Sequence, residues 1–136
     1  METVIVEHED GTFGVTERAP MESVWDAPQL ERFYWDEIRR VTLGLVRFSG
    51  DALRLLGLWP VVLRFGPLVH GRRAILGGLI ARRASGTIAW RADGHGISIE
   101  VDRYAPRLRG LPWRLQLSLH FLVGRRLLAR VAREAS

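Results

Sequence analysis

Residues 87–104, TIAWRADGHGISIEVDRY, alternate between apolar and polar side chains on both sides of Asp93-Gly94. Such alternation is typical of a strand with one buried face, and Asp-Gly favours the positive φ angles of a tight hairpin turn. With these two residues as the turn, Trp90 pairs with Ile97. One face of the predicted hairpin then carries Ile88, Trp90, Ile97, Ile99 and Val101. A register shifted by one residue would mix apolar with polar side chains, so the pattern favours this register.

Further β-type segments surround this hairpin. TVIVEHEDGTFGVTE (3–17) predicts another hairpin, with a type I′ turn at Asp10-Gly11. Between residues 41 and 65, three short runs predict three strands: VTLGLVRF (41–48), ALRLLG (52–57) and VVLRF (61–65).

GRRAILGGLIARRASG (71–86) combines glycines, arginines and apolar residues. A phosphate-binding loop needs glycines at set spacing between a strand and a helix start, whereas Gly77-Gly78 lie inside an apolar β-type run. A glycine pair there indicates a bulge or bend. We therefore predict an inner strand, bent near Gly77-Gly78, that turns at Ser85-Gly86 into the next strand.

Two helices are predicted. Asp26 as N-cap and Gln29 three residues later form the pattern of a capping box, and an apolar stripe follows, which predicts a helix over 27–40. LPWRLQLSLHFLVGRRLLARVARE (111–134) has a helical stripe, abundant leucine and Pro112 at its start. Strict alternation within 113–123 also fits a strand. We favour a long C-terminal helix, with the strand as the alternative.

Composition excludes several chemistries. All twenty basic residues are arginine, and the chain has no lysine and no cysteine. A Schiff-base enzyme, a Walker-type phosphate lysine, a thiol nucleophile, a disulfide and a zinc–thiolate site are therefore ruled out. No cofactor is expected.

The charge is segregated along the chain. Residues 1–51 contain eleven acids and five arginines, a balance of −6, and residues 52–136 contain four acids and fifteen arginines, a balance of +11. A basic face could meet an acidic partner, or the acidic part could pack over the basic part and neutralise it. We favour the second interpretation.

No membrane-spanning segment is predicted. The longest uncharged apolar run, LLGLWPVVL (55–63), has nine residues, against about twenty needed to cross a bilayer. The opening METVIVEHED is acidic and lacks the pattern of a secretory signal. We expect a cytoplasmic protein.

The chemistry-bearing residues form no known catalytic motif. The four histidines lack metal-binding spacing, and His120 stands out because the helical prediction places it on the apolar stripe. Glu100 and Asp102 share a strand face and could form a carboxylate pair, but a solvated outer face with Arg91 nearby is the favoured interpretation. Arginines interleaved with Trp59, Trp90 and Trp113 could bind nucleic acid, but Trp90 falls on the apolar face. Nucleic-acid binding is not expected.

The order of these elements resembles the START-like superfamily, also called SRPBCC or polyketide cyclase-like. The resemblance covers nearly the whole chain and rests on element order and size. It implies one α+β domain over residues 1–136, in which a curved antiparallel sheet grips the C-terminal helix around an apolar cavity. Two features depart from that pattern. The N-terminal hairpin has two strands where one is usual, and a second short helix after the first is not evident. A small antiparallel β-barrel of lipocalin type is the alternative if 113–123 is a strand.

The resemblance also implies a site and a function. Members bind lipids, sterols or polyketides, and some catalyse cyclisation or dehydration, so we expect an apolar or amphipathic small molecule as ligand. The candidate ligand-binding residues are Tyr34, Arg73, Trp90, Tyr104, Leu117, His120 and Phe121. Alternatives are a cyclase or isomerase that uses His120 as a base, and an interaction module whose basic surface meets an acidic partner. Homodimer formation stays open.

Overall fold

The computed structural model of the chain describes residues 2–20, 25–56, 61–93, 96–107 and 110–135, which form eight strands and two helices. Along the chain these are β1 (Glu2–Glu7), β2 (Phe13–Ala19), α1 (Ala27–Val41), β3 (Val46–Ser49), β4 (Ala52–Leu55), β5 (Val61–Phe65), β6 (Arg72–Gly77), β7 (Thr87–Asp93), β8 (Gly96–Tyr104) and α2 (Leu111–Ala135). The α+β class predicted from the sequence is confirmed.

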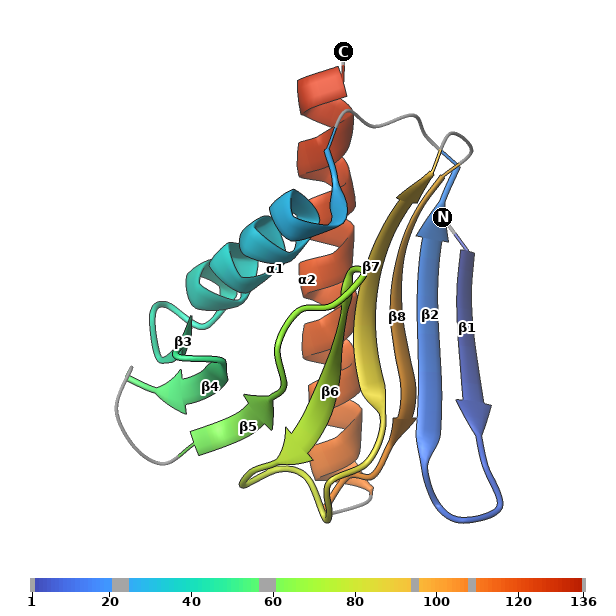
Figure 1. The fold of residues 1–136 in the computed structure, drawn as a ribbon, viewed down its shortest axis with the longest axis vertical. Helices are drawn as coiled ribbons and strands as arrows, with labels where there is room; N and C mark the ends of the chain where they lie inside the picture. Colours follow the sequence, from blue (N-terminus) through green and yellow to red (C-terminus); the bar gives the residue numbers. More distant parts are fainter. Residues whose placement is uncertain (1, 21–24, 57–60, 94–95, 108–109, 136) are drawn as a thin grey trace.

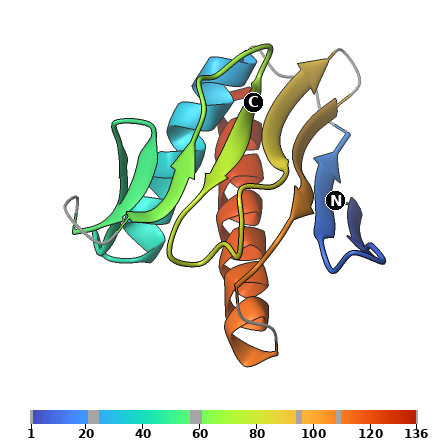
Figure 2. The ribbon, with the colours of Figure 1, turned by 60° about the horizontal axis from the view of Figure 1, so that its bottom comes forward.

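All eight strands belong to one antiparallel sheet in the order β1-β2-β8-β7-β6-β5-β4-β3. The N-terminal hairpin therefore joins the sheet through β8, the last strand. Figure 1 shows the sheet curving around α2, with β3–β5 turned beneath α1, and Figure 2 shows both helices on the same face. Because β1 and β3 remain as two free edges, the alternative of a closed lipocalin-type barrel is wrong.

Both helix predictions are confirmed. Asp26 caps α1: its carboxylate accepts the N–H of Gln29 at 3.0 Å, and the Gln29 side chain accepts the N–H of Asp26 at 3.0 Å. The segment 113–123 lies within α2 rather than in a strand. Its leucines are good helix formers, and the helix buries Val123 and Val131 against the core.

The β7–β8 hairpin has the predicted faces but a different register. Trp90 pairs with Ile99 rather than Ile97, a shift of two residues. Because side chains alternate with a period of two, this shift leaves the apolar face unchanged, and Trp90, Ile97 and Ile99 are fully buried there. The last described pair is Asp93 with Gly96, so the predicted turn at Asp93-Gly94 is wrong. Gly94 and His95, like Trp59, lie outside the described residues.

Two connections differ from the sequence prediction. The β1–β2 loop spans residues 8–12 instead of a two-residue turn, because the Asp10 carboxylate accepts the N–H and the hydroxyl of Thr12 at 3.0 and 2.7 Å. The run 41–48 begins as the end of α1 and becomes strand only at Val46. Gly77 is the last residue of β6, and the pairing of β5 with β6 shifts register between Ile75 and Gly77, as the predicted irregularity at the glycines requires. The next glycine is required, since a Cβ on Gly78 would lie 2.4 Å from the carbonyl oxygen of Val62.

Candidate functional site

An apolar cavity lies between the sheet and α2, under the C-terminal half of α1. Its volume is about 130 Å³. The lining comes from strands β2, β4–β8, both helices and the loop after β6: Val15, Tyr34, Trp35, Ile38, Leu53, Leu63, Phe65, Ile75, Ile80, Ile88, Val101, Tyr104, Trp113, Gln116, Leu117, Leu119, His120 and Val123. The wall is therefore almost wholly hydrocarbon, with a few polar groups from α1, β8 and α2.

Three polar side chains, Glu17, Tyr34 and His120, meet beside this cavity. The Tyr34 hydroxyl on α1 lies 2.7 Å from His120 Nδ1 on α2. The other ring nitrogen, Nε2, lies 3.2 Å from Glu17 Oε1 on β2. The residues that make this Glu17–His120–Tyr34 chain come from three elements far apart in the sequence, and Tyr34 and His120 both line the cavity.

Burial keeps the carboxyl and the imidazole of this chain uncharged over a wide pH range. Glu17 has no exposed surface, and burial raises the pKa of its carboxyl to about 7, against a weaker opposing effect of the Arg125 charge. Burial lowers the pKa of His120 to about 4. Between pH 4 and pH 7 both groups are neutral. Although Glu17 Oε1 and His120 Nε2 are only 3.2 Å apart, their contact is therefore not an ion pair in this range. Burial also raises the pKa of the Tyr34 hydroxyl, with a smaller contribution from Glu17.

The Glu17 carboxyl is held without good hydrogen bonds. Neither of its oxygens has an aligned hydrogen-bond partner among the described residues, and neither has His120 Nε2, although the two groups are close. Room for the carboxyl comes from Gly124 on α2, where a Cβ would lie 2.3 Å from Glu17 Oε2. An acid buried with unsatisfied oxygens lowers stability by a few kcal/mol. The stability of the fold therefore does not explain why a glutamate occupies position 17.

Sequence reasoning missed Glu17, although a signal was present. Residues of β2 alternate, and Phe13, Val15 and Ala19 face the core together with Glu17. A lone acid at an inward position of an otherwise apolar strand face marks a candidate functional group.

The predicted ligand-binding residues fall into two groups. Tyr34, Tyr104, Leu117 and His120 line the cavity. The hydroxyl of Tyr104 donates to the Ile80 carbonyl and lies 2.9 Å from Gln116 Oε1. Trp90, Arg73 and Phe121 do not line it. Trp90 is fully buried and packs edge-on against Tyr34 at 5.5 Å between ring centroids, behind the wall.

Arg73 belongs to a buried ion-pair network instead. Its guanidinium forms a bidentate ion pair with the Glu31 carboxylate of α1. It also donates hydrogen bonds to Asp51 Oδ1 and to the Gly66 carbonyl, each at 2.9 Å. These contacts tie β6 to α1 and to the β3–β4 turn. The donors that a ligand would need are thus engaged within the fold.

Other candidates lie apart from the cavity. Glu100 pairs with Arg91 at 3.1 Å on the outer face, where Arg91 was expected nearby, and Asp102 is exposed beside His8. Within the described residues, no group of three or more histidine or acidic side chains is arranged to hold a metal ion. Nor does either described helix combine the length and apolar character needed to cross a bilayer.

Fold and site together define an α+β protein in which an open antiparallel sheet surrounds a long helix, with an interior apolar cavity and a buried Glu–His–Tyr chain beside it. Comparison with protein-family models, with curated proteins and with solved structures finds no match for this chain. Its function is therefore argued from its own geometry.

Proposed function

We propose that the protein binds a small apolar or amphipathic molecule in the cavity, with a polar group of the ligand at Tyr34 and His120. The observation that carries this proposal is the cavity itself: a nearly all-hydrocarbon wall that ends at a buried polar chain. Apolar pockets with a few convergent polar groups are the usual form of small-molecule sites. The helix held by a curved sheet supports the START-like resemblance, from which the same function was expected.

The volume narrows the ligand class. An engineered cavity of roughly 150 Å³ lined by Leu, Ile and Phe binds benzene, whereas drug-sized ligands occupy roughly 300–1,000 Å³. At about 130 Å³, the present cavity fits one ring or a short branched chain. A whole lipid or polyketide requires the cavity to widen, so we propose a ring-sized ligand or the apolar end of a larger one.

Thermal unfolding with benzene, phenol and benzoate tests this proposal. Ligand at one hundred times its dissociation constant adds about 2.7 kcal/mol to stability, which raises the melting temperature of a domain of this size by several degrees. We expect shifts with benzene and phenol, a larger one with phenol, and none with charged benzoate. Tyr34→Phe should remove the preference for phenol. Melting temperatures unaffected by the whole panel would exclude this function.

A second candidate function is acid–base catalysis of the isomerase or cyclase type. The observation that favours it is the neutral imidazole of His120 between an acid and a phenol. If the Tyr34 hydroxyl turns from His120 Nδ1 to the carbonyl oxygen of a ligand, Nδ1 becomes free to take a proton from the adjacent carbon, and the enolate oxygen accepts the hydrogen bond of Tyr34. Cyclohexanone in D₂O is a suitable probe, because exchange of its α-hydrogens reports this step. His120→Ala should abolish the exchange, and exchange at the wild-type rate would exclude the role.

A further inference from the structure

Four leucines are exposed at one end of the β3–β4 ribbon. Leu43 is 91% exposed, Leu56 57%, Leu45 52% and Leu55 38%. Leu45, Leu55 and Leu56 are neighbours in space, since the N–H of Leu56 donates to the carbonyl of Leu45 at 2.6 Å and Val46 pairs with Leu55. Leu43 precedes Leu45 by two residues in the turn between α1 and β3. Single exposed leucines are ordinary, but a contiguous group on one edge marks an interaction surface.

Two of these leucines occupy backbone positions that disfavour them. Leu43 and Leu56 both have φ of 55°, in the left-handed region where glycine or asparagine is far less strained. Neither side chain packs into the core in return, because both are mostly exposed. Their presence is therefore not explained by the stability of the fold.

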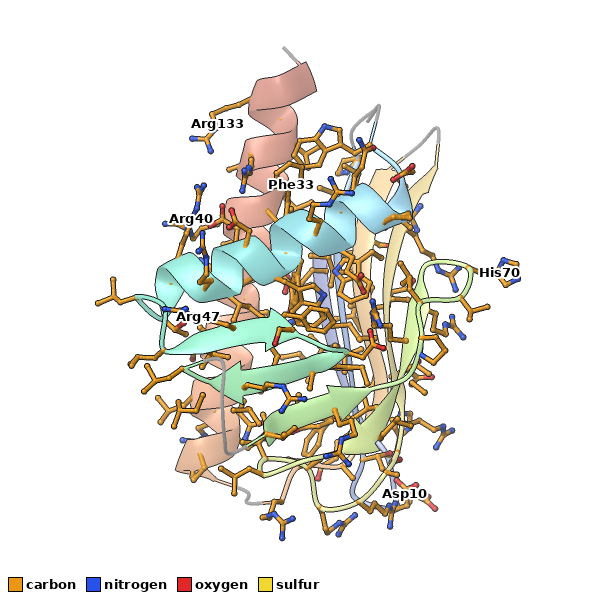
Figure 3. The ribbon with its side chains drawn as sticks, turned by 60° about the vertical axis from the view of Figure 1, so that its left-hand side comes forward. Asp10, Phe33, Arg40, Arg47, His70 and Arg133 are labelled. Carbon is orange, nitrogen blue, oxygen red and sulfur yellow. The ribbon has the colours of Figure 1, made fainter. Side chains whose placement is uncertain are left out.

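Two arginines lie beside the leucines, on the opposite face of the ribbon from Leu55. Arg47 and Arg54 lie directly opposite each other across β3 and β4, and like charges at such positions destabilise a sheet. Arg47 is held over the turn by a 2.9 Å hydrogen bond to the Gly44 carbonyl. Residues 39–56 contain four arginines and one aspartate. Figure 3 shows two of the four, Arg40 and Arg47, at this side of the molecule, away from His70 and Asp10.

We propose that this leucine–arginine patch docks on the surface of an anionic lipid bilayer. The patch consists of Leu43, Leu45, Leu55, Leu56, Arg47 and Arg54. Leucines enter the boundary between headgroups and acyl chains, and arginines next to them meet lipid phosphates, which also relieves the repulsion between Arg47 and Arg54. The proposal rests on the surface alone and not on the function of the cavity.

The patch also adjoins the cavity wall. Leu53 lines the cavity, and Leu55, two residues further along β4, lies on the same face of that strand and is exposed. A docked molecule would thus hold one wall of its cavity next to the bilayer.

Co-sedimentation with large vesicles tests the docking. We expect the protein to sediment with vesicles of phosphatidylcholine and phosphatidylglycerol and to stay in solution with phosphatidylcholine alone. Leu43→Ser/Leu56→Ser should weaken binding at least about tenfold. Arg47→Gln/Arg54→Gln should weaken it about thirtyfold, since each arginine near an anionic surface adds about fivefold. Because the second variant removes a like-charge pair, its melting temperature should not fall.

The matched control is Val4→Ser/Val6→Ser on β1. These valines are each 44% exposed and lie at the opposite edge of the sheet, so vesicle binding should be unchanged. The proposal is overturned if the wild type does not bind anionic vesicles, or if both patch variants bind them as tightly as the wild type does. A concentration-dependent dimer that the patch variants abolish, without vesicle binding, would assign the surface to a second copy and would equally overturn it.

Discussion

At the scale of single residues, the most informative side chain is Glu17. A carboxyl with no exposed surface and no aligned hydrogen bond is costly in any fold. Here the cost is limited because the group keeps its proton up to about pH 7. His120, 3.2 Å away, stays unprotonated down to about pH 4. Between these two pH values both groups are therefore uncharged.

The two groups should act on stability in opposite directions as pH changes. The pKa of Glu17 is raised from 4.5 to about 7 on folding, so its contribution to stability is present below pH 4.5 and is lost as pH rises to 7. The pKa of His120 is lowered from 6.5 to about 4, so its contribution is present above pH 6.5 and is lost as pH falls to 4. In the wild type the two trends offset each other between pH 4.5 and 6.5.

Urea unfolding of Glu17→Gln and His120→Asn from pH 4 to 8 separates these trends. Relative to the wild type, the free energy of unfolding of Glu17→Gln should gain with rising pH between 4.5 and 7. That of His120→Asn should lose with rising pH between 4 and 6.5. Profiles parallel to the wild type in both variants would show that neither group is perturbed as described.

At the scale of elements, Arg73 on β6 links the sheet to α1 through Glu31 and also contacts the β3–β4 turn through Asp51. Its side chain and that of Glu31 are each only 9% exposed. Removing one member of such a pair leaves the other charge buried and alone, which typically costs about 3–5 kcal/mol, while removing both costs much less. Arg73→Met should therefore destabilise strongly, and Arg73→Met/Glu31→Met should recover most of the loss.

Urea unfolding of the wild type, both single variants and the double variant measures this coupling. Arg91→Met is the control, because the pair of Arg91 with Glu100 is more exposed, with side chains 57% and 31% accessible, and such pairs contribute about 0–1 kcal/mol. Equal losses for Arg73→Met and Arg91→Met would mean that the Arg73 network does not hold the elements together.

Elements with strong local signals were predictable, and their connections were not. The capping box of Asp26 and Gln29 and the apolar stripe behind it predicted α1 to within one residue. The hairpin of β7 and β8 had the right faces and the wrong register, because a shift of two residues leaves every side chain on its face. Of the predicted site residues on α2, Leu117 and His120 line the cavity and Phe121 does not. Glu17 and the Arg73–Glu31 pair depend on contacts between distant segments, which periodicity does not contain.

At the scale of the whole molecule, the segregated charge of the sequence is partly neutralised by packing. Ion pairs cross between the acidic and the basic parts of the chain: Asp36 with Arg130 at 3.0 Å, Glu37 with Arg126 at 2.7 Å and Asp10 with Arg83 at 3.8 Å, besides the Arg73 network. Packing of the acidic part against the basic part is thereby confirmed. The arginines of the leucine–arginine patch take no part in these pairs among the described contacts, which leaves their charge for an external partner.

The position of the cavity in the core leads to a prediction about adding a methylene group at two valines of α2. Val123 and Val131 lie on the same helix and are almost completely buried, but only Val123 lines the cavity. One added methylene at Val123 enters empty space and gains up to about 0.8 kcal/mol, whereas at Val131 it meets a filled core and costs about 1–3 kcal/mol. Val123→Ile should therefore raise the melting temperature and reduce the shift caused by benzene, and Val131→Ile should lower it. If both variants are destabilised alike, the space beside Val123 is not available to a ligand of any kind.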